Sequence, residues 1–199
     1  MKHILVVVWS IAVFISGSVV AADDSGKFAA KGAARKSCND FTQSAQQKNS
    51  DYLLYGGWLE GYVTSYNQFQ PSNYDVVPWQ TTELLLALLQ RHCKANPDIK
   101  YLDAVNSLIK TVFPIRLEKE SPLVKVSVAD KDSYYYVEIL QRAKQRLKFL
   151  GYYNTAVDGS VFTPLDVEVF VKYQKDLGIP QTGIPDQFTL SNLFLKKTQ

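Results

Sequence analysis

Hydrophobic side chains recur at helical spacing along the first half of the chain. Over residues 52–69 they follow intervals of about one helical turn, at Tyr55, Trp58, Leu59, Tyr62, Val63 and Tyr66, as in an amphipathic helix. Comparable patterns predict helices over 33–48, 79–94 and 101–113, separated by the proline-containing stretch 70–78 and by Asn96-Pro97. Residues 28–113 are therefore expected to form a four-helix domain.

The pattern changes between residues 114 and 133. Two prolines and the alternating stretch Leu-Val-Lys-Val-Ser-Val at 123–128 predict a linker that can contain a short strand. Such a strand must pack on a domain or pair with something, because a lone strand is marginal in water. From residue 134 helical spacing returns, with helices expected to end at Gly151, to run from Pro164 to Gly178, and to cover 188–195. The expected fold class is all-α, with a second small helical domain over 134–197.

Residues 1–22 have the composition of a targeting segment. A basic start, an apolar core of about a dozen residues and small residues before Asp23 are typical of a cleaved secretory signal. The alternative is a membrane anchor, but the core is shorter than the roughly 20 residues that cross a bilayer. We expect cleavage after Ala21 or Ala22, and a periplasmic protein without a stable membrane anchor.

The only cysteines of the sequence are Cys38 and Cys93. In an exported protein such a pair is expected to form a disulfide, here between the first predicted helix and the end of the third. The spacing excludes a CxxC redox pair, and the lack of further ligands excludes a zinc site, so no metal and no cofactor are expected. Basic and acidic residues are mixed, with a net charge of +3 and no basic stripe, which argues against nucleic-acid binding.

The second half carries a specific pattern of glycines and aromatic residues. It includes Leu150-Gly151-Tyr152-Tyr153, Val157-Asp158-Gly159, Phe170, Gln174, Leu177-Gly178-Ile179-Pro180, Thr182-Gly183 and Asp186. This stretch, from about 135 to 195, resembles the peptidoglycan-binding domain that is often appended to bacterial wall enzymes. Thr163 stands where the family usually has glycine, Asp166 where it has threonine, and Tyr173 where it has phenylalanine. The resemblance implies a three-helix fold and binding to peptidoglycan.

A shallow site for peptidoglycan needs an aromatic wall and a few fixed polar groups. The predicted ligand-binding residues are Tyr152, Tyr153, Asn154, Asp158, Tyr173 and Gln174. Other interpretations stay open: one of the two consecutive tyrosines belongs to the core, and Asp158 forms a turn with Gly159 rather than a ligand contact. Tyr173 and Gln174 are compatible with either orientation.

The first half shows a weaker resemblance. Cys38, Gly57-Trp58, Gly61-Tyr62, Asn67, Trp79, Cys93, Asn96-Pro97 and Ala104 follow a pattern similar to small, disulfide-tied helical periplasmic proteins of the acid-stress chaperone and amidase-immunity type. The resemblance implies a disulfide-tied helical fold for this half. It does not transfer an activity, because such proteins work through their surfaces and a surface cannot be matched from one sequence. The first half has more aromatic side chains than a helical bundle of this size can easily bury. They predict a partner surface at Trp58, Tyr62, Tyr66 and Trp79, with full burial in the core as the alternative.

The chain has too few of the side chains that most classes of wall-cleaving enzyme need for catalysis. After residue 22 the only histidine is His92, too few for a zinc amidase, and it has no motif of a serine triad. Cys93 adjoins His92 on a helix, where neighbouring side chains point apart, and it has a better role in the disulfide. A glycan-cleaving enzyme needs a carboxylic acid in a cleft, and Glu60, among aromatic residues, is the candidate.

The expected function is that of an exported, non-enzymatic peptidoglycan-binding protein whose helical domain engages a periplasmic protein. One alternative is a chaperone or immunity-type inhibitor of a wall amidase that is anchored to peptidoglycan. Another is a wall hydrolase that uses Glu60.

Overall fold

The structure, a computed structural model, describes residues 23–196. The predicted signal at 1–22, with its cleavage after Ala21 or Ala22, lies outside the described residues. Among the helices of the described part, none combines the length and apolar character needed to cross a bilayer. In the leading segment 23–30, the Asp23 carboxylate accepts hydrogen bonds from the N–H groups of Ser25 and Lys27.

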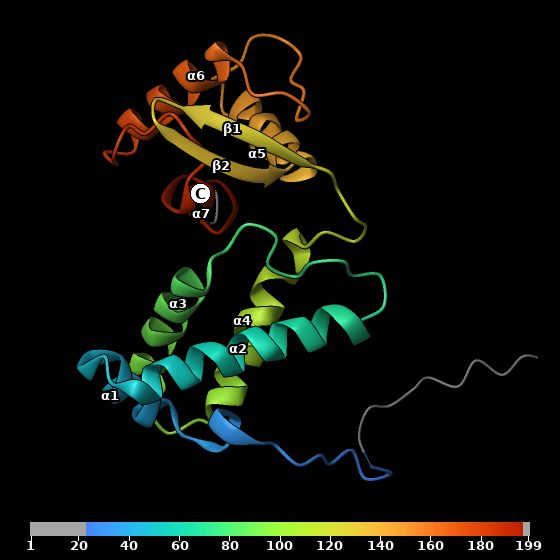
Figure 1. The fold of residues 1–199 in the computed structure, drawn as a ribbon, viewed down its shortest axis with the longest axis vertical. Helices are drawn as coiled ribbons and strands as arrows, with labels where there is room; N and C mark the ends of the chain where they lie inside the picture. Colours follow the sequence, from blue (N-terminus) through green and yellow to red (C-terminus); the bar gives the residue numbers. More distant parts are fainter. Residues whose placement is uncertain (1–22, 197–199) are drawn as a thin grey trace, which may run out of the picture. The chain divides into compact units, whose positions relative to one another are not determined.

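The first half of the chain contains the four predicted helices. They are α1 (Cys38–Gln47), α2 (Ser50–Phe69), α3 (Thr82–Ala95) and α4 (Tyr101–Val112), with short 3₁₀ helices η1 (Gly32–Arg35) and η2 (Phe113–Ile115) at either end (Figure 1). α1 begins later than predicted because Ser37 and Asp40 form a capping box. α3 also begins late, because Thr81 caps it and leaves Trp79 outside the helix. We call residues 31–116 the helical lobe.

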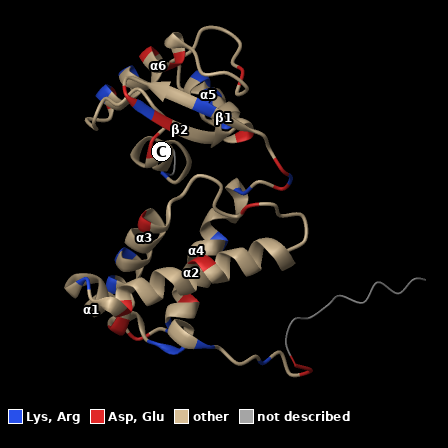
Figure 2. Ribbon diagram, in the orientation of Figure 1, with Lys and Arg blue, Asp and Glu red and all other residues tan. Residues whose placement is uncertain are grey.

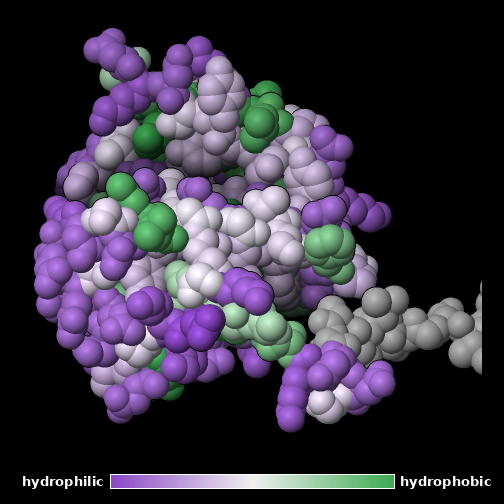
Figure 3. All heavy atoms as spheres, turned by 60° about the horizontal axis from the view of Figure 1, so that its bottom comes forward, coloured by the Kyte–Doolittle hydropathy of each residue, from purple (hydrophilic) through white to green (hydrophobic). Residues whose placement is uncertain are grey.

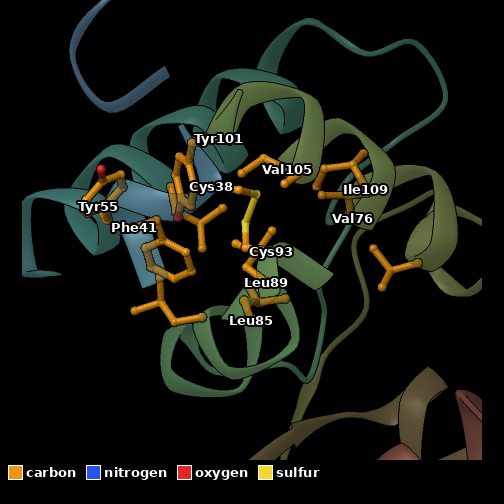
Figure 4. Packing of buried hydrophobic residues seen from close by; sticks show 14 residues of the cluster. Cys38, Phe41, Tyr55, Val76, Leu85, Leu89, Cys93, Tyr101, Val105 and Ile109 are labelled. Carbon is orange, nitrogen blue, oxygen red and sulfur yellow. A yellow bond between two sulfur atoms is a disulfide. The ribbon is translucent and has the colours of Figure 1, made fainter. Parts of the chain in front are cut away.

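The disulfide between Cys38 and Cys93 is present and joins α1 to α3, as predicted. Both cysteines are fully buried in the hydrophobic core of the helical lobe, where Phe41, Leu89 and Tyr101 lie close by (Figure 4). The rings of Phe41 and Tyr101 have their centroids 4.8 Å apart. Phe41 also meets Tyr55 edge-on, at 5.1 Å. The core is thus built from tilted and edge-on aromatic pairs around the disulfide, the arrangements that aromatic rings prefer.

A β-hairpin corrects the all-α prediction. β1 (Leu123–Val128) pairs antiparallel with β2 (Lys131–Tyr136), in a register from Leu123↔Tyr136 to Val128↔Lys131. The helix expected from residue 134 therefore begins only at Val137. The pairing forms because Val126 is buried and packs with Leu140 of the next helix and Ile184, so one face of the hairpin is covered. Over residues 23–196 the fold is mostly helical and includes this hairpin, and the stretch 114–133, expected as a linker, contains β1.

The last three helices are α5 (Val137–Phe149), α6 (Pro164–Asp176) and α7 (Gln187–Phe194), and the hairpin lies along α5 (Figure 1). Gly151 and Gly178 follow the first two at φ +85° and +66°, the left-handed positions predicted for helix ends. Thr163 and Asp166 form a capping box at the start of α6. Both positions differ from the family pattern, and in the structure each side chain accepts a hydrogen bond from the backbone N–H of the other. We call residues 117–196 the C-terminal lobe.

Trp79 joins the two lobes. It is buried and packs with Leu117 and other residues of the C-terminal lobe, and its ring centroid lies 5.9 Å from that of Phe194. The side-chain amide of Gln187, at the start of α7, donates to the Trp79 carbonyl and accepts from the Thr81 N–H. The loop before α3 is therefore fixed to α7 by both apolar packing and hydrogen bonds.

Candidate functional site

A buried ion pair holds the loop between α5 and α6. Lys144 Nζ lies 2.8 Å from the Asp166 carboxylate and donates to the carbonyls of Asp158 (2.7 Å) and Val161 (2.6 Å). Burial works against the charged carboxylate, but hydrogen bonds from Lys144, Thr163 and Tyr153 outweigh it and hold the pKa of Asp166 below its ordinary value. An ammonium has three donors, and all are used here. The pair therefore fixes the loop and offers no charge to a ligand.

A buried amide holds the next loop, between α6 and α7. Gln174 is fully buried. Its Nε2 donates to the Ile184 carbonyl and the Thr189 hydroxyl, at 2.9 and 2.8 Å, while its Oε1 accepts from the Gly183 N–H at 2.9 Å. Gly183 has φ +70°, and a Cβ there would lie 2.8 Å from a methyl of Val167. This position thus favours glycine on both conformational and steric grounds.

The structure divides the six predicted ligand-binding residues between core and surface. Tyr153, Tyr173 and Gln174 are buried, and the Tyr153 hydroxyl donates to Asp166 at 2.7 Å. Burial, and then this bond, raises the pKa of Tyr153 well above its ordinary value. We therefore correct the prediction for these three residues, which hold the lobe together and present no face to a ligand. Tyr152 is half-buried, and Asn154 and Asp158 are exposed.

Asp158 is exposed, but its carboxylate belongs to a turn. It accepts hydrogen bonds from the Ser160 N–H and hydroxyl, both at 2.8 Å, and these bonds lower the pKa of Asp158. A Cβ on the neighbouring Gly159 would lie 2.4 Å from the Val137 carbonyl oxygen, so only glycine lets this turn pack directly on α5. The geometry agrees with the turn-forming interpretation of Asp158.

Tyr152 presents an aromatic ring at the surface between charged neighbours. Its hydroxyl donates to Asp176 at 2.8 Å, and Lys172 Nζ lies 5.5 Å from the ring centroid. Burial, and then the bond to Asp176, raises the pKa of Tyr152 to about 12, so the phenol stays protonated at neutral pH. We call Tyr152, Lys172 and Asp176, together with the exposed Asn154 two residues after Tyr152 in the chain, the Tyr152 face. Sequence reasoning missed Lys172 and Asp176, although their spacing of four residues on α6 places them on one side of that helix.

The four aromatic residues predicted as a partner surface also separate. Trp58, Tyr62 and Tyr66 are half-buried on α2, with the rings of Trp58 and Tyr62 stacked at 5.1 Å. Trp79 is buried against the C-terminal lobe, so its partner lies within the same chain, and its assignment to an external partner surface is corrected.

A cavity of about 460 Å³ adjoins Trp58. Gly32, Leu54 and Tyr55 are among its other lining residues. Leu54 and the adjacent Leu53 are 68% and 75% exposed, so this end of α2 shows apolar surface. On the face drawn in Figure 3, hydrophobic side chains gather in separate patches on a mostly hydrophilic surface.

Glu60, the candidate catalytic acid, lies in a different cavity of about 260 Å³. Glu60 is exposed, and its Oε1 accepts a hydrogen bond of 2.6 Å from the Thr82 hydroxyl. Within residues 23–196, no cluster of three or more His, Cys, Asp or Glu side chains could hold a metal ion. Basic and acidic residues are interspersed along the ribbon (Figure 2).

Comparison with models of protein families gives a match within the C-terminal lobe. Residues 137–193 match the family model described as "Putative peptidoglycan binding domain". The matched range runs from the first residue of α5 into α7 and includes Tyr152, Asn154, Lys172 and Asp176. The resemblance predicted for this stretch is thus confirmed, whereas that of the helical lobe stays a prediction. No curated protein matches the chain, and no solved structure matches it.

Proposed function

We propose that this protein acts outside the cytoplasm, where its C-terminal lobe binds peptidoglycan and its helical lobe engages another protein. The observation that carries the proposal is the family match over 137–193. The buried disulfide between Cys38 and Cys93 supports the location, because such bonds persist in oxidising compartments such as the bacterial periplasm.

The Tyr152 face is the surface that we assign to peptidoglycan. A wall fragment offers sugar rings, amides and carboxylates. The Tyr152 ring suits an apolar sugar face, the exposed Asn154 suits an amide, and Lys172 suits a carboxylate. The buried network around Lys144 holds the loop that carries Tyr152 and Asn154, and Gln174 fixes α6, which carries Lys172 and Asp176, to the loop before α7. The face therefore needs little rearrangement to bind.

The helical lobe is proposed to work through its surface and without catalysis. A glycosidase acid is typically held in an apolar pocket that keeps it protonated, whereas Glu60 is exposed and bonded to Thr82. The apolar end of α2, with Leu53, Leu54 and Trp58 beside a cavity, is the part of this lobe best suited to a protein partner.

Sedimentation with insoluble peptidoglycan tests the binding proposal. The purified protein is expected to co-sediment, and the double substitution Asn154→Ala with Lys172→Ala should weaken binding by about thirtyfold, because each lost hydrogen bond contributes roughly 1 kcal/mol and the two together roughly 2 kcal/mol. The matched control is Gln181→Ala with Lys131→Ala, which removes one amide and one cation from exposed positions outside the Tyr152 face. Control binding should equal that of the unchanged protein.

The outcomes separate the function from the site. Failure of the unchanged protein to sediment would reject peptidoglycan binding, whereas unchanged binding of the folded Asn154 and Lys172 variant would reject only the Tyr152 face. The turbidity of the same suspension should stay constant, and clearing that vanishes in Glu60→Gln would show a wall hydrolase instead. Suppressed aggregation of an unfolded client, or inhibition of a wall amidase, would identify the helical lobe as a chaperone or an immunity-type inhibitor.

A further inference from the structure

A cavity of about 370 Å³ is lined by one side of α3 and one side of α4. α3 contributes Leu88, Arg91 and His92, and because the last two follow Leu88 by three and four residues, all three lie on the same side of the helix. α4 contributes Ser107 and Leu108. None of these residues belongs to the Tyr152 face, to the cavity beside Trp58 or to the cavity beside Glu60, so this cavity is a separate feature of the molecule.

Part of the lining of this cavity is apolar and accessible. Leu88 and Leu108 are half-buried, and so is Leu195, which follows α7 and also lines the cavity. Leu108 and Leu195 pack on the core of the helical lobe with one side, and the rest of each side chain is in contact with solvent. An alkyl group that covered these three leucines would remove their apolar surface from water, which is favourable.

Arg91 and His92 bring hydrogen-bond donors to the same cavity. Arg91 is exposed and His92 is half-buried, so a ligand can reach both side chains. Among residues 23–196, neither side chain has a hydrogen-bond or ion-pair partner, and the described lining of the cavity includes no Asp or Glu. The negative end of α3, at Ala95, offsets only about half of the Arg91 charge. The cavity therefore favours a ligand that carries a negative charge beside an apolar part.

We propose that this cavity binds an amphiphile with a carboxylate head and a single alkyl chain, the chemistry of a medium-chain fatty acid. The carboxylate accepts two parallel hydrogen bonds from the Arg91 guanidinium, the geometry in which these two groups pair best, and one from the His92 ring. The alkyl chain covers Leu88, Leu108 and Leu195. The volume of about 370 Å³ lies near the lower end of the range of roughly 300–1,000 Å³ typical of small-ligand sites, which suits one chain and not the two chains of a membrane lipid.

The test is a titration of the ¹⁵N-labelled protein with sodium octanoate at slightly acidic pH, where the carboxylate stays ionised, and below the concentration at which octanoate forms micelles. The side-chain Nε–H resonance of Arg91 and the backbone amide resonance of Leu108 should shift and saturate. Octan-1-ol has the same chain without the charge, and it should bind about tenfold more weakly, because a charge-assisted hydrogen bond is lost. Butanoate should bind at least tenfold more weakly, because it lacks four methylene groups and each one that is buried changes the affinity by about fourfold.

Three results would overturn the proposal. The first is that the Arg91 and Leu108 resonances do not move with octanoate. The second is equal affinity for octanoate and octan-1-ol, which would mean that the cavity does not recognise the carboxylate. The third is that vesicles of phosphatidylglycerol perturb these resonances whereas octanoate does not, which would assign this surface to a membrane lipid.

Variants distinguish this site from general attraction of an anion to a basic surface. Arg91→Gln should weaken octanoate binding about tenfold and abolish the preference for octanoate over octan-1-ol. Lys94→Gln is the matched control, because it removes an equal charge from an exposed position in the last turn of α3 that does not line the cavity. The control should bind octanoate as the unchanged protein does, and an equal loss in the two variants would contradict a defined site. None of these comparisons involves the Tyr152 face, so their outcome does not depend on wall binding.

Discussion

At the scale of single residues, the buried ion pair of Lys144 and Asp166 fixes the loop between α5 and α6 in the C-terminal lobe. Lys144 is 2% exposed and Asp166 is 4% exposed, although both residue types usually face water. Such a pair adds little stability compared with apolar residues of equal size, but removing one partner leaves a buried charge unpaired. Lys144 also satisfies the carbonyls of Asp158 and Val161, so it links α5 to the loop that carries Tyr152 and Asn154.

We therefore expect Lys144→Met to lower the free energy of unfolding by about 3–5 kcal/mol at neutral pH. Lys148→Met, one helical turn later at an exposed position, should change it by less than about 0.5 kcal/mol. The folded pKa of Asp166 is depressed, so the stability from this pair is present above the unfolded pKa of about 3.9 and is lost as pH falls below it. The difference between Lys144→Met and the unchanged protein should shrink in that acid range. Urea titrations measure this, and a constant difference would contradict the ion-pair account.

The same pair explains what could not be predicted for single residues. Tyr152 and Tyr153 follow Gly151 in a loop, where no helical or strand period tells which of them faces inward. Tyr153 turns inward because its hydroxyl donates to Asp166, and burial of that carboxylate depends on Lys144, which has no separate signal in the sequence. Asp158 was better constrained, because an Asp-Gly pair predicts a turn by itself.

At the scale of secondary structure elements, the sequence predicted the helices, but of the hairpin it predicted only the first strand. The apolar stripes of α2, α4 and α5 match their buried sides. β1 showed alternation, but β2 carries Tyr134 to Tyr136 directly before α5, so its aromatic residues extended the helical pattern. The connection at Ala129-Asp130 lacks the Asn-Gly or Asp-Gly signal of two-residue hairpin turns, and Ala129 takes φ +51° without a glycine.

The disulfide is the strongest single constraint between elements of the helical lobe. It links positions 55 residues apart, and in the chain-entropy model a loop of this length contributes about 4 kcal/mol. Cys38→Ala with Cys93→Ala should lower the free energy of unfolding by that amount, as measured in urea. Reductant should destabilise the unchanged protein and leave the double variant unaffected. A loss below about 1 kcal/mol would indicate that aromatic packing around Phe41 holds α1 and α3 together without the bond.

At the scale of the whole molecule, the excess of aromatic residues in the first half has a partly internal explanation. Trp79 was assigned to an external partner because sequence spacing cannot tell a partner protein from a later part of the same chain. In the structure Trp79 packs against the C-terminal lobe, in a hydrophobic cluster that includes Leu117, Phe170 and Leu190. The signal for this contact lies in Gln187 and Phe194, more than a hundred residues later, and no local pattern connects them with Trp79.

This contact makes the stability of the C-terminal lobe depend on a residue from the helical lobe. Trp79→Ala removes a large buried side chain and should cost about 3–5 kcal/mol, with faster amide hydrogen exchange in α5 and α7, because the cluster that covers them is opened. Trp58→Ala is the matched control: its half-buried ring packs on the core of the helical lobe, so it should leave exchange in α5 and α7 unchanged. Protection of these two helices that survives Trp79→Ala would mean that the lobes are stabilised separately. Loss of protection in Trp79→Ala alone would mean that the C-terminal lobe and the helical lobe are coupled in stability through this one side chain.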